Sequence, residues 1–169
     1  MQWKLFLFGP PRLERNGTPI EVPLRKGLAL LVYCAVTRRP HSRDALATLF
    51  WPDKDQQAAR ANLRRLLYDL GQLLGDSFLA LAAENVTLNS QANIWLDVEQ
   101  YRQCLSYSAE SASPASAAQL AHPKEAADLY AADFMAGFTL ADCPEFDDWQ
   151  FFQRDELRRS LAGVLYQLV

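Results

Sequence analysis

The chain has 169 residues, 50% of them hydrophobic and 22% charged, a composition typical of one or two globular domains that excludes a disordered or fibrous protein. No apolar run approaches the roughly 20 residues that cross a bilayer, and the short apolar start lacks a signal-peptide cleavage site, so we expect a cytoplasmic protein with no membrane partner. The net charge of −3 hides an asymmetry: residues 1–98 hold 12 Lys and Arg against 9 Asp and Glu, whereas residues 99–169 hold 5 against 11. This pattern indicates a basic binding half and an acidic partner half.

Strands followed by helices are expected in the first half of the chain. Residues 3–8 are rich in strand-forming side chains, and Asn16-Gly17 predicts a tight hairpin between segments 12–15 and 18–22. Apolar residues at helical spacing predict a helix over 24–37, and Ser42 is placed to cap a second helix over 43–51. The first half therefore begins with three strands and two helices.

The most informative segment is a third helix expected at residues 56–75, with Asp53 or Asp55 as its N-cap. One face carries a stripe of six leucines: Leu63, Leu66, Leu67, Leu70, Leu73 and Leu74. The opposite face, at about 100° per residue, carries Ala61, Arg64, Arg65, Tyr68 and Gln72. A slim helix with one buried side and arginines on the other is what the major groove of DNA admits, although ordinary surface helices share the pattern.

A short hairpin is expected after this helix, with residues 78–82 and 86–88 joined by the turn Ala83-Glu84-Asn85. Residues 94–96 either add a last strand or lead out of the domain. Three strands, three helices and a hairpin in this order resemble a winged helix of the OmpR type, whose last helix enters the groove and whose hairpin is the wing. The predicted fold class is thus an α+β winged-helix domain, with a three-stranded sheet, over residues 1–96.

Acidic, alanine-rich helices are expected over residues 97–169. The spacing predicts helices at 98–107 and 124–136 around a loop rich in Ser and Ala, and a long last helix that begins at Cys143-Pro144-Glu145. The apolar stripe of this last helix is still running at Leu168. We therefore expect either that the protein continues beyond residue 169 or that the helix packs on a second copy.

Several motifs resemble the SARP-type family of bacterial transcriptional regulators. In the winged-helix half they are Arg25-Lys26 and the segments 41–47 (HSRDALA), 49–53 (LFWPD) and 59–65 (ARANLRR). In the second half, Leu129-Tyr130 and the segments 133–138 (DFMAGF) and 144–149 (PEFDDW) are similar to the bacterial transcriptional activation domain (BTAD). In that family the BTAD is all-helical and tetratricopeptide-like (TPR-like), follows the winged helix, and is longer than the residues that remain here. The resemblance implies that 97–169 holds only its first helices.

The resemblance implies a DNA-binding activator, nucleoid-associated in a bacterial cell, that binds direct repeats in promoters and recruits RNA polymerase. The polymerase contact is implied for the loop at 52–57, with Asp53, Lys54 and Asp55. No cofactor, metal or catalytic residue is expected. A homodimer through the C-terminal helix is a further expected partner.

Roles for the individual side chains follow from their chemistry. Arg64 and Arg65 are suited either to fork onto guanine or to clamp phosphates, and Arg60, one turn earlier, is better placed for phosphate. Tyr68 either contacts a sugar-phosphate or a thymine methyl, or is an ordinary half-buried surface tyrosine. Two roles stay open for three residues near helix starts, contact with a DNA phosphate or simple solvation as a surface charge: Arg25, Lys26 and Arg43.

The expected wing departs from the pattern of the family. Where wings of this class place a basic residue in the minor groove, this turn offers Glu84 and Asn85. We therefore expect weak DNA binding by one copy and a need for two copies side by side.

An enzyme and a protein-interaction module are the two classes of function that compete with DNA binding. An enzyme is disfavoured because phosphate-loop, dinucleotide and zinc-protease motifs are absent from the sequence, and because His41 and His122 are isolated. Cys143 lies near a helix start, a position that can lower the pKa of a thiol, but no His or Asn partner is evident nearby, so we expect a structural role for it. A protein-interaction module without DNA binding is the stronger alternative, favoured by the acidic helical half. The arginine face discriminates against it, since a pure adaptor has no use for one.

Overall fold

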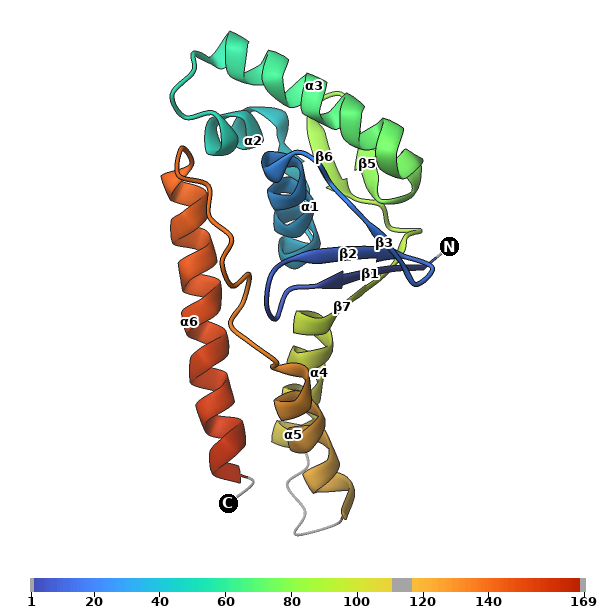
Figure 1. Cartoon of the computed structure of the whole chain (residues 1–169), viewed down its shortest axis with the longest axis vertical. Helices are drawn as coiled ribbons and strands as arrows, with labels where there is room; N and C mark the ends of the chain where they lie inside the picture. Colours follow the sequence, from blue (N-terminus) through green and yellow to red (C-terminus); the bar gives the residue numbers. More distant parts are fainter. Residues whose placement is uncertain (1, 111–116, 168–169) are drawn as a thin grey trace. The chain divides into compact units, whose positions relative to one another are not determined.

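The computed structural model describes residues 2–110 and 117–167 and has a mixed α/β fold (Figure 1). The strands are β1 (Gln2–Phe6), β2 (Arg12–Arg15), β3 (Thr18–Ile20), β4 (His41–Ser42), β5 (Leu79–Leu81), β6 (Asn85–Leu88) and β7 (Asn93–Leu96). The helices are α1 (Arg25–Thr37), α2 (Arg43–Phe50), α3 (Gln56–Leu74), the short 3-10 turn η1 (Gly75–Ser77), α4 (Asp97–Glu110), α5 (Ala117–Leu129) and α6 (Pro144–Gln167). The expected order of strands, helices and a hairpin in the first half is confirmed.

The strands form two small sheets, in the orders β3-β2-β1-β7 and β4-β6-β5. The predicted hairpin joins β2 to β3, and its turn residues Asn16 and Gly17 have φ of 51° and 82°, as a tight turn of type I′ requires. The expected three-stranded sheet was wrong, because β7 joins as a fourth strand. Ile94 and Leu96 alternate with more exposed neighbours in β7, so this strand has an apolar face to bury.

Both helix caps expected in the first half are confirmed. The Ser42 hydroxyl accepts a hydrogen bond from the Ala45 N–H at 3.1 Å and begins α2. The Asp55 carboxylate accepts one from the Ala58 N–H at 2.8 Å and begins α3. Such bonds satisfy backbone donors that a helix start otherwise leaves unpaired, which fixes where each helix begins.

The chain divides into two compact units that do not follow the sequence in order. Unit 1 holds residues 1–4, 13–94 and 139–149, and unit 2 holds 5–12, 95–138 and 150–169. The predicted domain boundary between residues 96 and 97 stays a prediction. Among the described helices none is both long and apolar enough to span a bilayer.

The core of unit 1 contains aromatic side chains from distant parts of the sequence. Trp3 on β1 meets Phe78 edge to face at 5.4 Å between ring centroids. Phe50 at the end of α2 lies 5.5 Å from Phe146 in the first turn of α6. The segment 139–149 is therefore part of the packing around α1 and α2, which its place late in the chain does not suggest.

The bounds expected for the helix at 124–136, which lies in unit 2, were wrong. Phe134 forms an antiparallel bridge with Phe8, and the Met135 N–H donates to the Leu7 carbonyl at 2.7 Å. The chain leaves the helical conformation to make these strand-like bonds, so α5 spans Ala117–Leu129 and ends earlier than its sequence suggested. The expected loop before it was wrong at both ends, because α4 runs to Glu110 and α5 begins at Ala117; its residues 111–116 lie outside the described residues.

The long last helix is confirmed, with Pro144 as its first residue. Of its expected apolar stripe, Phe146, Leu157 and Val164 are buried, whereas Phe152 and Leu165 are exposed. Leu168 lies outside the described residues.

Two glycines near the end of α3 provide a matched test of the backbone. Replacing Gly71 with alanine should stabilise the protein by about 0.5–1 kcal/mol, since the site is helical and nothing lies within 4 Å of an added Cβ. Replacing Gly75 with alanine should destabilise it by about 1–3 kcal/mol, because its φ of 67° and ψ of −170° suit only glycine. Urea unfolding of both variants measures the difference, and shifts of the same sign would contradict the assignment.

Candidate nucleic-acid interface

Helix α3 has the two faces that its sequence predicts. The buried face consists of Ala59, Leu63, Leu66, Leu67, Leu70 and Leu74. Ala61, Arg64, Arg65 and Tyr68 lie on the opposite, exposed face, and Tyr68 is 66% exposed. Tyr68 is therefore not the half-buried residue that was the alternative, and its ring is accessible from solvent.

Arg64 and Arg65 make no ion pair within the described part of the chain. Both are exposed, and they follow each other on the outward face of α3. An exposed guanidinium group that is not held in an ion pair is able to form two parallel hydrogen bonds to a guanine edge or a phosphate without first breaking an ion pair in the protein.

Arg60, one turn earlier, is placed differently. Its Nε lies 2.6 Å from the Asp44 carboxylate on α2, and its Nη2 lies 3.4 Å from the Glu84 carboxylate. Arg60 thus links α3 to α2 and to the hairpin β5–β6. Its charge is largely balanced by two acids, which weakens its suitability for a phosphate.

The hairpin β5–β6 is also held by Arg43 at the start of α2. The Arg43 Nε donates to the Ala82 carbonyl at 3.0 Å, and its backbone N–H donates to the Glu84 carbonyl at 2.9 Å. Beyond the expected pairing of β5 with β6, strand β4 pairs with β6, His41 facing Val86. The turn residues Glu84 and Asn85 are exposed, so the expected wing projects an acid and an amide.

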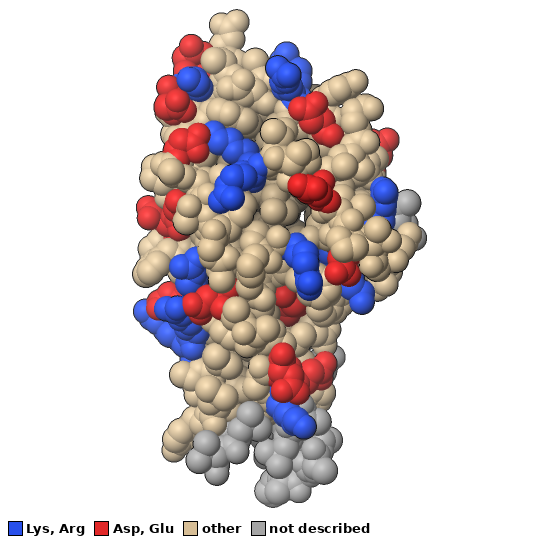
Figure 2. Space-filling model, in the orientation of Figure 1, with Lys and Arg blue, Asp and Glu red and all other residues tan. Residues whose placement is uncertain are grey.

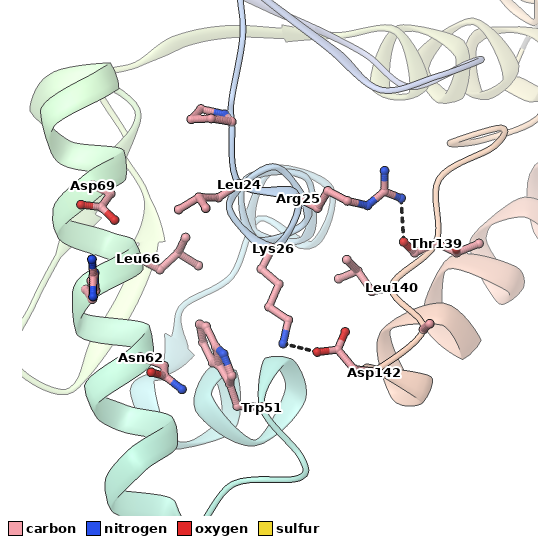
Figure 3. A pocket seen from close by; sticks show the side chains of 13 residues that line it. Leu24, Arg25, Lys26, Trp51, Asn62, Leu66, Asp69, Thr139, Leu140 and Asp142 are labelled. Carbon is pink, nitrogen blue, oxygen red and sulfur yellow. Dashed lines mark hydrogen bonds and ion pairs between the residues drawn. The ribbon is translucent and has the colours of Figure 1, made fainter.

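Arg25 and Lys26 at the start of α1 turn their donors toward the segment 139–142 (Figure 3). The Lys26 Nζ lies 2.6 Å from the Asp142 carboxylate and donates to the Phe50 carbonyl at 2.6 Å. Arg25 donates to the Thr139 carbonyl at 2.7 Å. The hydrogen bond and charge of Lys26 lower the pKa of Asp142. These contacts occupy donors that the sequence made available to phosphate.

These groups line a pocket of about 850 Å³ that reaches the side of α3. Figure 3 shows Asn62, Leu66 and Asp69 on the α3 side of this pocket, with Trp51 between them and Lys26. The Lys26 ammonium lies 5.0 Å from the centre of the Trp51 ring, a cation–π distance. Arg65 lines the same pocket, so one arginine of the exposed face borders both the pocket and the solvent.

The loop between α2 and α3 is exposed at Asp53, Lys54 and Asp55. Asp55 caps α3, and the Lys54 ammonium lies 3.4 Å from Asp53. Exposed pairs of this kind contribute at most about 1 kcal/mol, so Asp53 and Lys54 are accessible to a partner at little cost.

The surface charge is mixed. On the face drawn in Figure 2, the described Lys and Arg side chains are interspersed with Asp and Glu and form no broad basic area. A DNA contact made through this face would therefore depend on a few well-placed arginines, and its electrostatic component would be modest.

The cysteines and His41 are buried. Cys34, Cys104 and Cys143 are present as thiols, none of them in a disulfide. Burial raises the pKa of Cys143 to about 11, which agrees with the structural role expected for it. Burial, and then the charge of Arg39, lower the pKa of His41, whose ring nitrogen lies 2.6 Å from the Thr37 hydroxyl.

Sequence reasoning missed the acids that neutralise the candidate arginines and lysine. Asp44, Glu84 and Asp142 lie far in sequence from the cations they bind, and nothing in their spacing signals the pairing. The sequence does not give the state of a surface arginine, because that state depends on contacts between distant segments.

Fold and site together define a mixed α/β chain in which α3 exposes Arg64 and Arg65, two arginines without an ion pair among the described residues. No family model and no curated protein matches the sequence. Among solved structures, the chain is similar to EmbR of Mycobacterium tuberculosis, in complex with a low-affinity phosphopeptide, with a TM-score of 0.72 and 21% identity. The match covers 96% of this chain and 45% of that chain, so this chain spans less than half the length of EmbR. At this identity the likeness shows the fold.

Proposed function

We propose that residues 1–96 are a winged-helix domain of the OmpR type that binds double-stranded DNA with α3 in the major groove. The observation that carries the proposal is the exposed pair Arg64 and Arg65, which have no ion-pair partner in the described chain and stand opposite the buried stripe of α3. The order of strands, helices and hairpin supports it, as does the fold shared with EmbR. A pure interaction module has no use for this arginine face.

In the proposed complex, Arg64 and Arg65 supply the main contacts. They fork onto guanine O6 and N7 or clamp phosphates, and Tyr68 contacts a thymine methyl or a sugar-phosphate beside them. Ala61 is small enough to let the helix approach the base edges. Arg25, Lys26 and Arg43 stay engaged within the protein and contribute little.

Removing the acid of the proposed wing should strengthen binding. In a Glu84→Gln variant, Arg60 loses one of its two carboxylate partners, and the wing no longer repels phosphate, so affinity for duplex DNA should rise about two- to fivefold. Fluorescence anisotropy at fixed salt measures the change. Glu21→Gln, which changes the net charge equally outside the hairpin, is the control. An equal rise in both variants would contradict a contact made by the wing.

We further propose that residues 97–169 are the first helices of a TPR-like activation domain and that the whole is a SARP-type activator with no enzymatic activity. The segments 133–138 and 144–149, which resemble the activation domain of that family, support this proposal. The exposed loop with Asp53 and Lys54 is accessible to RNA polymerase.

Selection from a pool of random duplexes tests sequence-specific binding. The proposed function predicts enrichment of a short motif in two direct copies, spaced to place two proteins on one face of the DNA. Recovery of no common motif, with binding proportional to duplex length alone, would contradict sequence-specific regulation and indicate a protein that binds DNA without sequence preference.

Two copies side by side on DNA require contact between them, and we propose that α6 supplies part of it. Its exposed apolar residues are Phe151, Phe152, Leu165 and Tyr166. A Phe151→Ser/Phe152→Ser variant should shift the protein toward monomer in sedimentation equilibrium. Leu81→Ser, which removes an apolar side chain of similar exposure from the hairpin, should leave the distribution unchanged. A wild type that is monomeric at high concentration would refute this contact.

A further inference from the structure

A cluster of ligand-type side chains lies between α4 and α5, within unit 2. The Cys104 thiol, a His122 ring nitrogen and a Glu125 carboxylate oxygen all lie within 4.8 Å of one another. Cys104 comes from α4 and is 2% exposed. His122 and Glu125 are three residues apart on α5, a spacing that puts both on one face of a helix. His122, isolated in the sequence, is therefore not isolated in the fold.

The distances suit a small metal ion. Ligands that surround a tetrahedral Zn²⁺ at about 2.0–2.3 Å stand roughly 3.5 Å from one another. From separations of at most 4.8 Å, small side-chain rotations reach this arrangement without moving the helices.

The chemistry of the three donors selects the ion. A thiolate and an imidazole are ligands that Zn²⁺ prefers, whereas Mg²⁺ and Ca²⁺ require sets of oxygen ligands. Thiolate, imidazole and carboxylate supply three of four tetrahedral positions, and the partly exposed side of the cluster leaves the fourth to water.

Gln100 supports the same arrangement from one turn before Cys104. Its Nε2 lies 3.9 Å from the Cys104 sulfur and 3.5 Å from the Glu125 Oε1. An amide N–H that donates to both atoms orients them, as groups behind metal ligands commonly do.

We propose that Cys104, His122 and Glu125 bind one Zn²⁺ ion that joins α4 to α5. The site is independent of the proposed DNA contact, because each of its ligands belongs to unit 2, whereas α3 belongs to unit 1. The bound ion stabilises the packing of the two helices, since a ligand that binds only the folded chain shifts the unfolding equilibrium toward it.

Metal titration of the full chain, first freed of metal by a chelator, tests the site. Calorimetry should show one Zn²⁺ per chain, the thermal midpoint should rise on addition of Zn²⁺, and Co²⁺ should give the absorption of a metal–thiolate bond. Failure of Zn²⁺ to bind, or Co²⁺ binding without thiolate absorption, would overturn the proposal.

Variants locate the ion. Each of three single variants, Glu125→Gln, His122→Gln and Cys104→Ser, should weaken Zn²⁺ binding more than about 100-fold. Glu125→Gln alters an exposed side chain and should leave the fold intact. Gln100→Ala should weaken it about 10- to 100-fold. Cys34→Ala, which removes a buried thiol from α1, is the matched control and should bind as the wild type. Equal Zn²⁺ affinity in the wild type and the Glu125 and His122 variants would place the ion elsewhere and refute the site.

Discussion

Replacing Arg64 and Arg65 together with alanine should reduce affinity for duplex DNA about 30-fold or more. Each arginine that contacts a base or a phosphate contributes about 1–3 kcal/mol, and neither has a competing ion pair in the described chain that would reduce its contribution. Both side chains are exposed, so their loss should leave the stability of the fold unchanged. Anisotropy at low salt measures the affinity, and urea unfolding verifies the fold.

Two further variants sharpen this test. Arg64→Lys/Arg65→Lys keeps the charge but loses the planar fork, so it should retain non-specific binding and lose discrimination between sequences. Arg39→Ala/Arg159→Ala removes the same charge from exposed positions outside α3 and should bind nearly as the wild type. A control that loses as much affinity as the α3 variant would show that net charge, and not the α3 face, governs binding.

Replacing Asp97 with alanine should destabilise unit 2 by about 3 kcal/mol. The side chain of Asp97 is buried, and its Oδ2 accepts hydrogen bonds from the N–H groups of Leu7 and Phe8 at 2.8 and 2.9 Å. Its Oδ1 accepts a third from the Val98 N–H at 2.8 Å. Alanine leaves these buried donors without a partner. Each unpaired donor lowers the free energy of unfolding by about 1–3 kcal/mol, and water that enters the site recovers part of this loss.

A graded series separates lost hydrogen bonds from lost charge at this position. Asp97→Asn keeps an acceptor oxygen for Leu7 and Phe8 and should cost less than Asp97→Ala. Asp155→Ala removes a half-buried aspartate whose partner is Arg159 on the same helix, and should cost about 0.5 kcal/mol or less. Chemical unfolding measures all three. Equal losses for Asp97→Ala and Asp155→Ala, both small, would contradict the structural role of Asp97.

The features that the sequence predicted well are local. The stripe and exposed face of α3, the caps at Ser42 and Asp55, and the turn at Asn16-Gly17 depend on residues within a few positions of one another. Periodicity and capping chemistry act over this range, so a single sequence is enough to predict them.

The features that sequence analysis missed depend on contacts between distant segments. β7 joins β1 across most of the first half of the chain, and residues 133–135 abandon a plausible helix to pair beside residues 7–9. The same is true of Lys26 with Asp142 and of Cys104 with His122. Helix propensity is a weak preference that such tertiary hydrogen bonds override.

The measurement that tests the central claim most directly is the salt dependence of binding to a generic duplex by the unmodified chain. If α3 enters the groove, the logarithm of the binding constant should fall with the logarithm of salt concentration with a slope of about −2 or steeper, because phosphate contacts release counterions. The Arg64→Ala/Arg65→Ala variant should lose most of that slope. Absence of binding by the unmodified chain at low salt, or a slope shared by the variant, would contradict DNA binding through α3 and favour a protein-interaction module instead.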